Sequence, residues 1–210
     1  MQRRSPDFNL YLITDRRQTR GRELLKVVEQ ALDGGVRAIQ LREKDLSGRE
    51  LFLLAETMKA VCARYRARLF INERIDVALA VDADGVQLGG GAIPIDSARK
   101  LVGNNKRIGA STHSIEEALA AERAGADFIL FGPVYFTPSK AAYGPPQGLE
   151  LLKEVVEKIS LPVYAIGGVK PENIAAVKKT GAHGIAVISA VMSAEEPSAA
   201  SRELLRLLKA

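Results

Sequence analysis

The sequence predicts an α/β fold, a single compact (β/α)8 TIM barrel that spans residues 1–210 as one domain. Eight short apolar segments alternate with helix-type patterns along the chain. Strand–helix–strand repeats require parallel pairing with right-handed crossovers. Eight such repeats close most simply into a barrel, for which 210 residues is near the lower limit. We find no linker or change of composition that would divide the chain.

The expected strands are short and mostly apolar, with many β-branched residues, as is typical of strands buried on both faces. Their side chains should point alternately toward the helices and into the barrel. In chain order the strands cover residues 10–13, 38–41, 69–71, 85–88, 107–110, 128–131, 162–166 and 184–188.

Eight helices are expected between and after these strands. Apolar residues recur at three- and four-residue spacing, as at Leu51, Leu54, Met58 and Val61, which predicts amphipathic helices. An open doubly wound sheet is the competing architecture. The first strand-to-helix turn, at 14–17, lacks the glycine-rich dinucleotide fingerprint, so the barrel is favoured. Residues suited to cap or begin the expected helices are Ser47, Pro94 or Asp96, Ser114 and Pro171.

Composition excludes several classes of protein. Hydrophobic residues make up 47% and charged residues 26% of the chain, which excludes a disordered or collagen-like protein. No apolar run reaches the roughly 18 residues of a membrane span, and the run after the basic N-terminus is too short for a signal peptide. The single cysteine, Cys62, cannot form an intrachain disulfide. We therefore expect a cytoplasmic protein that has no contact with a membrane.

The net charge of +5 does not by itself indicate nucleic-acid binding. Nucleic-acid proteins usually gather their basic residues on one stripe, often beside stacking aromatics. Here aromatic residues are 5% of the chain, Trp is absent, and most basic residues are scattered. We interpret the local cluster in the first loop as a solvated loop: Arg16, Arg17, Arg20 and Arg22. A mildly positive surface also suits small anionic substrates.

A barrel of this kind works at the carboxyl ends of its strands. On the second strand, alternation directs Gln40, Arg42 and Lys44 inward and upward. Two cations on an inner face are costly unless an anion meets them. Pairing with Glu43 and Asp45 is the alternative, but those residues have the opposite parity. We therefore expect Arg42 and Lys44 to bind an anionic substrate.

Polar side chains also follow the third, fourth and fifth strands. Asn72 has inward parity and offers both a donor and an acceptor. The fourth strand ends with Gln87 on the inner side, before three glycines. Ser111 and His113 follow the fifth strand. Because imidazole titrates near neutral pH, His113 is the candidate general acid or base.

The last three strand ends point to a phosphorylated substrate. The sixth loop, 132–148, is long and rich in glycine and proline, as functional lids are, and contains Thr137, Ser139 and Lys140. Barrels often bind phosphate between the seventh and eighth loops. The residues there are Gly167 and Gly168 on one side and Ile188 and Ser189 on the other. His183 precedes the eighth strand, at the opposite end, and is given no catalytic role.

The sequence contains no zinc, EF-hand, P-loop or nucleophile-elbow motif. It does contain a series of short motifs between about residue 10 and the end of the chain: residues 40–44 (QLREK), Asn72, 109–113 (GASTH), 131–134 (FGPV), 137–140 (TPSK), 165–168 (AIGG) and 188–190 (ISA). Together these motifs resemble the thiamin phosphate synthase/TenI superfamily. The resemblance implies a compact (β/α)8 barrel, in agreement with the strand count.

The resemblance implies one of two reactions. Thiamin phosphate synthase joins hydroxymethylpyrimidine pyrophosphate to thiazole phosphate and releases pyrophosphate. The thiazole tautomerase converts thiazole phosphate carboxylate to its aromatic tautomer, with a histidine matching His113 as proton shuttle. In the synthase the pyrimidine and pyrophosphate would be held by Gln40, Arg42, Lys44, Asn72, Ser111 and Lys140. The thiazole phosphate would be held by Thr137, Ser139, Gly168, Ile188 and Ser189.

Departures from the synthase pattern favour the tautomerase. By the resemblance, the synthase has aspartates where this chain has Glu73 and Ala92, and they anchor Mg²⁺ on the pyrophosphate. Glu73 could still bind the ion, but Ala92 cannot, and Asp96 could substitute only if its loop folds differently. The synthase also usually has histidine where this chain has Gln87. We therefore expect a tautomerase that needs no cofactor, with His113 and Ser111 as catalytic residues.

Three other functions stay open. A synthase that tolerates the missing ligand would use Mg²⁺. A non-catalytic protein that senses thiazole phosphate or thiamin phosphate would keep the phosphate loops without turnover. A Schiff-base aldolase would use Lys44 or Lys140. The expected partners are a small phosphorylated thiazole and, for a synthase, a pyrimidine pyrophosphate. A homo-oligomer is compatible with the fold because barrels often associate through helix faces.

Overall fold

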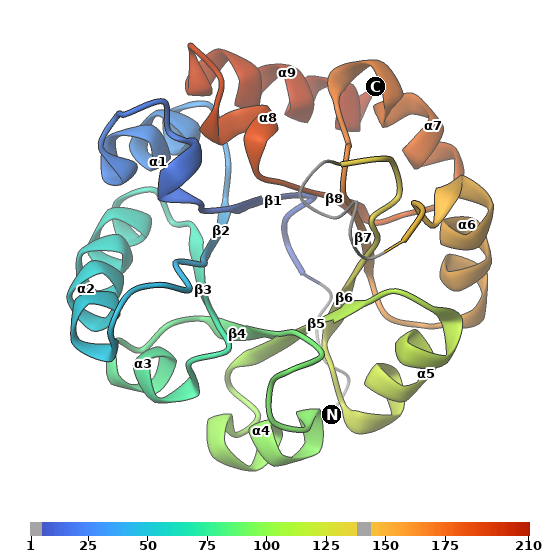
Figure 1. Ribbon diagram of the computed structural model, residues 1–210, viewed down its shortest axis with the longest axis horizontal. Coiled ribbons are helices and arrows are strands. Elements are labelled where there is room, and N and C mark those ends of the chain that lie inside the picture. Colours follow the sequence, from blue (N-terminus) through green and yellow to red (C-terminus); the bar gives the residue numbers. More distant parts are fainter. Residues whose placement is uncertain (1–5, 138–143) are drawn as a thin grey trace.

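The computed structural model describes residues 6–137 and 144–210, and its parallel strands close into a barrel in the order β1 to β8. Figure 1 looks along this barrel and shows the helices arranged around the strands. The predicted (β/α)8 barrel is therefore confirmed. The strands are β1 (Leu10–Ile13), β2 (Ala38–Leu41), β3 (Arg68–Asn72), β4 (Gly85–Leu88), β5 (Arg107–Thr112), β6 (Phe128–Phe131), β7 (Val163–Ile166) and β8 (Gly184–Val187).

The helices follow the strands in the expected order, with one short addition, α8, between β8 and the last helix of the described chain. The helices are α1 (Leu24–Asp33), α2 (Gly48–Arg64), α3 (Ile75–Ala80), α4 (Ile95–Val102), α5 (Ile115–Ala124), α6 (Gly148–Lys158), α7 (Ile174–Lys179), α8 (Ser189–Met192) and α9 (Pro197–Lys209). Short 3-10 turns are η1 (Arg16–Gln18) and η3 (Pro171–Asn173).

The predicted caps are found at α2 and α5. Ser47 accepts a hydrogen bond from the Glu50 backbone and Ser114 from the Glu117 backbone, so each hydroxyl satisfies an otherwise free N–H group of a first turn. Pro94 is the N-cap of α4, which places Asp96 inside that helix. Pro171 begins η3, and α7 follows only at residue 174.

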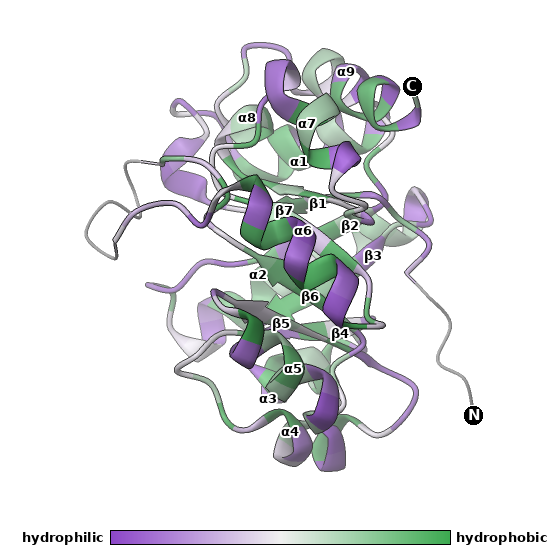
Figure 2. Cartoon of the chain, turned by 90° about the vertical axis from the view of Figure 1, so that its right-hand side faces the viewer, coloured by the Kyte–Doolittle hydropathy of each residue, from purple (hydrophilic) through white to green (hydrophobic). Residues whose placement is uncertain are grey.

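The barrel has two hydrophobic cores, one on each side of its strands. Ile39 and Leu41 of β2 belong to the core between the strands and the helices. The second core lies inside the barrel and includes Ala38 of the same strand. Figure 2 shows the strands mostly in the hydrophobic colour, whereas the helices also carry hydrophilic residues. The alternation predicted for β2 is therefore confirmed, which leaves Gln40 on the inner side.

Aromatic rings close the amino-terminal end of the barrel interior. Tyr11, Phe70 and Phe128 lie with ring centroids 5.3 to 5.8 Å apart. Phe8, from the segment before β1, stacks on Tyr164 at 5.3 Å and accepts a 2.6 Å hydrogen bond from its hydroxyl through the backbone oxygen. Aromatic pairs at such distances stabilise a core beyond the area they bury. A ligand must therefore enter from the other end.

Strand register determines which side chains lie above this aromatic floor. In a (β/α)8 barrel, alternate strands contribute to one layer of side chains. The layer above Tyr11, Phe70 and Tyr164 consists of Gln40, Gln87, Leu130 and Ala186. The next layer toward the carboxyl ends of the strands consists of Ile13, Asn72, Ser111 and Ile166.

In the described part of the chain, no helix has the length and apolar character needed to cross a bilayer.

Candidate active site

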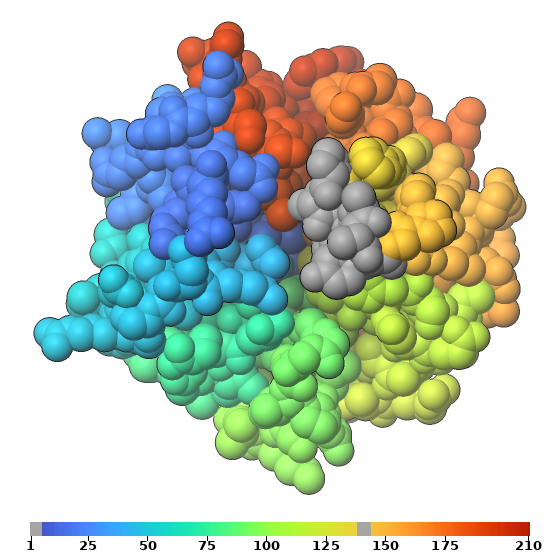
Figure 3. Space-filling model, viewed as in Figure 1, coloured from blue at the N-terminus to red at the C-terminus, as the bar shows by residue number. Residues whose placement is uncertain are grey.

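The two upper layers divide the barrel mouth into a polar wall and an apolar wall. Figures 1 and 3 view the molecule from the side of the loops that surround this mouth. The polar wall, from β2 to β5, consists of Gln40, Arg42, Asn72, Gln87 and Ser111. The apolar wall, from β6, β7, β8 and β1, consists of Ile13, Leu130, Ile166, Ala186 and Ile188. A flat heterocycle could lie with its face against the apolar wall and its polar edge toward the polar wall.

Two buried amides lie at the base of the polar wall. Gln40 and Gln87 are each 1% exposed. The Gln87 side-chain nitrogen donates to the Ser111 hydroxyl at 3.1 Å. Neither Gln87 Oε1 nor Gln40 Nε2 has a hydrogen-bond partner within the described residues. These two atoms are therefore available to a ligand that supplies both a donor and an acceptor.

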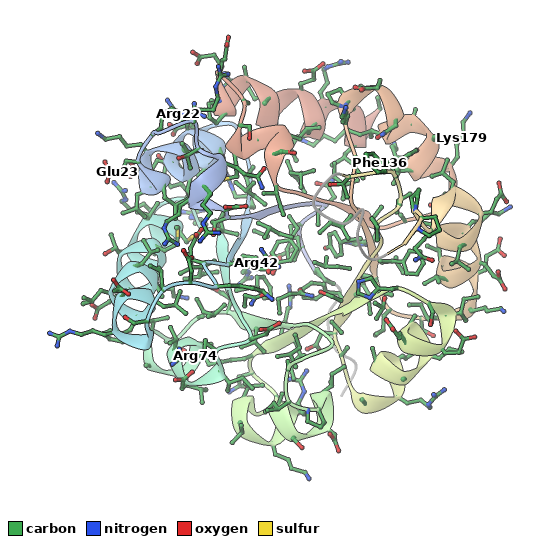
Figure 4. All side chains as sticks on the ribbon, viewed as in Figure 1. Arg22, Glu23, Arg42, Arg74, Phe136 and Lys179 are labelled. Atoms are coloured by element: carbon green, nitrogen blue, oxygen red, sulfur yellow. The ribbon has the colours of Figure 1, made fainter. Side chains whose placement is uncertain are left out.

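Arg42 and Lys44 lie where β2 continues into its loop. The Arg42 backbone N–H donates to Thr14 Oγ1 at 3.0 Å. Its guanidinium forms no ion pair with any residue described in the structure, and Figure 4 places it within the ring of strands. Lys44 Nζ lies 3.8 Å from Glu73 Oε1. An unpaired guanidinium at the mouth is suited to an anion such as a phosphate.

Glu43 and Asp45 pair with the first loop, as the parity argument requires, and not with Arg42 or Lys44. Arg16 binds Glu43 at 3.1 Å and Asp45 at 2.6 Å, and Arg17 binds Asp45 at 2.8 Å. Hydrogen bonding to Arg16 lowers the pKa of the Asp45 carboxyl to about 2. Both arginine side chains reach solvent, as expected of a solvated loop, with Arg16 36% and Arg17 74% exposed, and in addition they pair with the acids that follow β2.

Arg22 also has a structural role. Its guanidinium donates to the backbone oxygens of Met192, Ala194 and Glu195 at 2.7 to 3.1 Å. These hydrogen bonds join the β1 loop to the segment after α8. This role could not be predicted from the sequence, because backbone carbonyls carry no side-chain signature.

Glu73 is the carboxylate available for a metal at the mouth. It lies in the left-handed region, with φ +58°, and its Oε1 is so close to Gly89 that a Cβ there would approach within 2.8 Å. Across the described residues, no three or more His, Cys, Asp and Glu side chains group as metal ligands. Asp96 is exposed on α4 and accepts from the Ser97 backbone. Since Mg²⁺ is often held by one carboxylate together with phosphate oxygens and water, the residues fit an ion completed by its substrate.

The glycines after β7 allow two loops to pack closely. Gly167 and Gly168 have φ of +92° and +66°. A Cβ on Gly167 would lie 2.6 Å from Pro133, and one on Gly168 2.7 Å from the Phe136 carbonyl oxygen. Tyr135 donates its N–H to Gly167 O at 3.0 Å. Only glycine fits this backbone and this spacing.

The remaining predicted phosphate residues are placed as follows. Ser189 begins α8 and Ile188 precedes it, at the end of β8. Thr137 is partly buried in the β6 loop, and Phe136 beside it is 67% exposed (Figure 4). Ser139 and Lys140 lie outside the described residues.

His113 bonds to Glu117 of the following helix, α5. It is exposed, its ring Nδ1 lies 3.2 Å from Glu117 Oε2, and its backbone N–H donates to the same oxygen at 2.7 Å. His183 lies at the opposite end of the barrel, with Nε2 3.2 Å from Phe8 O. Neither histidine contacts the buried amides of the polar wall through a hydrogen bond in the described chain.

The model of the family described as "Thiamine monophosphate synthase" matches residues 10–191. The chain belongs to this family. It is 45% identical over 201 residues to the thiamine-phosphate synthase of Clostridium novyi, covering 96% of this chain and 98% of that protein. It is equally identical, with 96% of each covered, to the thiamine-phosphate synthase of Syntrophomonas wolfei.

A solved structure agrees with these relatives. The thiamine phosphate pyrophosphorylase from Pyrococcus furiosus superposes on 96% of this chain and 95% of its own, with a TM-score of 0.87 and 45% identity. A 3-hexulose-6-phosphate synthase structure also superposes, with a TM-score of 0.74 and 25% identity. The family membership inferred from the motifs is therefore confirmed.

The expectation of a thiazole tautomerase is wrong. The relatives at 45% identity are named as synthases, and so is the matching family. The role of His113 as the proton shuttle of a tautomerase therefore no longer applies. The missing acid at Ala92 does not exclude a synthase, because a magnesium ion can take most of its ligands from phosphate and water.

Proposed function

We propose that this protein is a thiamine phosphate synthase, which joins hydroxymethylpyrimidine pyrophosphate to thiazole phosphate. In this reaction the lone pair of the thiazole nitrogen forms a bond to the pyrimidine methylene carbon. The carbon–oxygen bond to pyrophosphate breaks, and pyrophosphate leaves with the electron pair. The single observation that carries the proposal is the near full-length similarity to named synthases at 45% identity.

The polar wall suits the pyrimidine substrate. The unpaired Gln40 Nε2 and Gln87 Oε1 offer one donor and one acceptor to a ring edge that carries a ring nitrogen and an amino group. Ser111 orients the Gln87 amide through its hydrogen bond. Asn72, one layer higher, would meet the same ring or the first phosphate. Holding the ring here fixes the methylene carbon for attack.

Arg42 and Lys44 would bind the pyrophosphate. The Arg42 guanidinium is suited to two phosphate oxygens at once, and Lys44 adds a second positive charge. Both charges favour the leaving group more as its negative charge grows during bond breaking. Glu73 would hold Mg²⁺ together with pyrophosphate oxygens, and the ion would neutralise part of the same charge.

The apolar wall and its loops would hold the thiazole phosphate. Gly167 and Gly168 allow the β7 loop to pack against the β6 loop, and Ile188 and Ser189 follow β8. Barrels frequently bind phosphate between the loops after the seventh and eighth strands. The thiazole ring would then lie against the apolar wall, with its nitrogen toward the pyrimidine methylene. Thr137 of the β6 loop is a further candidate ligand, and the predicted ligands Ser139 and Lys140 follow it in the sequence, outside the described residues.

The deciding experiment follows pyrophosphate release. Purified protein is supplied with both substrates and Mg²⁺, and separately with each substrate alone. We expect sustained release and formation of thiamine phosphate only when both substrates are present, with a rate that falls when a chelator removes Mg²⁺. Tight binding of either substrate without release would instead support a non-catalytic sensor and would overturn the proposal.

A further inference from the structure

Glu43 is a buried carboxylate that the proposed reaction does not use. Its side chain is 3% exposed. It accepts hydrogen bonds from Thr14 Oγ1 at 2.8 Å, from the Arg16 backbone at 3.1 and 3.2 Å, and from the Arg16 guanidinium at 3.1 Å. Burial of a carboxylate is costly without such partners, so the arrangement requires all of these donors.

Thr14 connects this carboxylate to the substrate-facing segment. Its hydroxyl donates to Glu43 and accepts from the Arg42 backbone N–H at 3.0 Å. Its own N–H donates to Gln40 O at 2.9 Å. Since the Arg42 N–H can only donate, the hydroxyl proton must point to Glu43. The end of β1 is thereby fixed to β2 on both sides of Leu41.

The contacts between the β1 loop and the β2 loop extend beyond the last residue of β2. β2 ends at Leu41, so residues 42–45 are not held by the ladder of a strand. Arg16 holds Glu43 and also forms two hydrogen bonds with Asp45, at 2.6 and 2.8 Å. Residues 43 and 45 are therefore held by the β1 loop. Lys44 lies between them, with its Nζ 3.8 Å from Glu73 Oε1, and Arg42 precedes them within the ring of strands (Figure 4).

We propose that Thr14, Arg16 and Glu43, here called the β1–β2 clamp, are positioning residues for the diphosphate of the substrate. The clamp holds the Arg42–Asp45 segment so that the side chains of Arg42 and Lys44 are in place before the diphosphate binds. A site arranged in advance loses less entropy when its ligand binds. This inference rests on the proposed function, because Arg42 and Lys44 are assigned there to the pyrophosphate.

The first test removes the Thr14 hydroxyl. Thr14→Val keeps the shape of the side chain but loses the donor to Glu43 and the acceptor for Arg42. We expect inorganic pyrophosphate, titrated by calorimetry, to bind about tenfold more weakly. The KM for the pyrimidine substrate should rise similarly, whereas the KM for thiazole phosphate stays within about twofold. Thr14→Ser should restore both values, because serine keeps the hydroxyl.

A matched pair of arginine variants provides the second test. Arg16→Met removes the guanidinium that joins Glu43 to Asp45, and we expect the same selective loss of pyrophosphate binding. Arg17→Met is the control, because Arg17 contacts Asp45 but not Glu43 and its side chain is 74% exposed. Arg16 is partly exposed, so this variant remains informative if Thr14→Val does not fold.

The outcomes separate the clamp from the reaction. Unchanged pyrophosphate binding in folded Thr14→Val or Arg16→Met would overturn the inference, and so would equal weakening of both substrates. Absence of pyrophosphate binding to the unaltered protein would overturn it too. If pyrophosphate binding weakens selectively while no variant and no parent protein makes thiamine phosphate, the clamp stands and the proposed synthase activity fails.

Discussion

The polar wall and the apolar wall of the mouth are constructed by different means. On the polar wall the distinctive features are side chains: two buried amides with unpaired atoms and a guanidinium without an ion pair in the described chain. On the apolar wall they are backbone features, namely glycines at 132, 167 and 168 that let the β6 and β7 loops touch. Substitutions on the polar wall should therefore weaken substrate binding with little effect on stability. Substitutions of the loop glycines should lower both substrate affinity and the free energy of unfolding.

Arg42→Met should have the largest effect on catalysis. It removes the guanidinium from the polar wall while keeping most of the apolar stem, so the leaving pyrophosphate loses a charged donor. We expect kcat/KM to fall by roughly 10²- to 10³-fold, the usual cost of deleting a donor to developing charge. Arg49→Met, on the exposed face of α2, is the control. Steady-state kinetics would contradict the role of Arg42 if the loss were less than about threefold.

Gly168→Ala should test the apolar side. Its φ of +66° is unfavourable for alanine, and the new Cβ would meet the Phe136 carbonyl at 2.7 Å. We expect the unfolding free energy to fall by about 1–3 kcal/mol, with a several-fold rise in the KM for thiazole phosphate. Gly21→Ala is the matched control, because Gly21 also has positive φ but no neighbour within 4 Å of a Cβ. A stability loss equal to that control would show that the loop contact is unimportant.

Gln87→Leu should measure how much the buried Gln87 amide contributes to binding of the pyrimidine substrate. Leucine has a similar volume but neither accepts a hydrogen bond nor donates one to Ser111. We expect the KM for the pyrimidine substrate to rise about tenfold, since a polar ring edge would be buried without its partner. The melting temperature should change little, because an unsatisfied buried atom is removed at the same time. Gln30→Leu, on the exposed face of α1, controls for the loss of an amide. Equal KM values in the two variants would remove Gln87 from the site.

The sequence predicted the barrel and its inward-facing residues because both follow from local patterns. Alternation alone placed Gln40 and Gln87 inside the barrel, and the register confirms both placements. The Thr14, Arg16 and Glu43 contacts were missed because they join segments 27 to 29 residues apart through side chains. The available signal was Thr14, a hydroxyl residue directly after the apolar residues of the first strand. The reaction was also mispredicted. The absence of one carboxylate does not exclude Mg²⁺, because substrate phosphate and water can supply the remaining ligands of the ion.

His113→Asn should have the smallest effect and bears directly on the corrected function. His113 is exposed at the edge of the mouth, and its ring contacts Glu117 of α5 and none of the polar-wall residues. A synthase with this geometry needs no proton transfer from that ring, because bond formation uses a nitrogen lone pair and pyrophosphate leaves as an anion. We expect kcat and both KM values to stay within about twofold, together with an unchanged pH profile between pH 6 and 8. A loss of tenfold or more in kcat would return His113 to the reaction. Asparagine retains a hydrogen-bonding group beside Glu117, so a fall in stability alone would not account for such a loss.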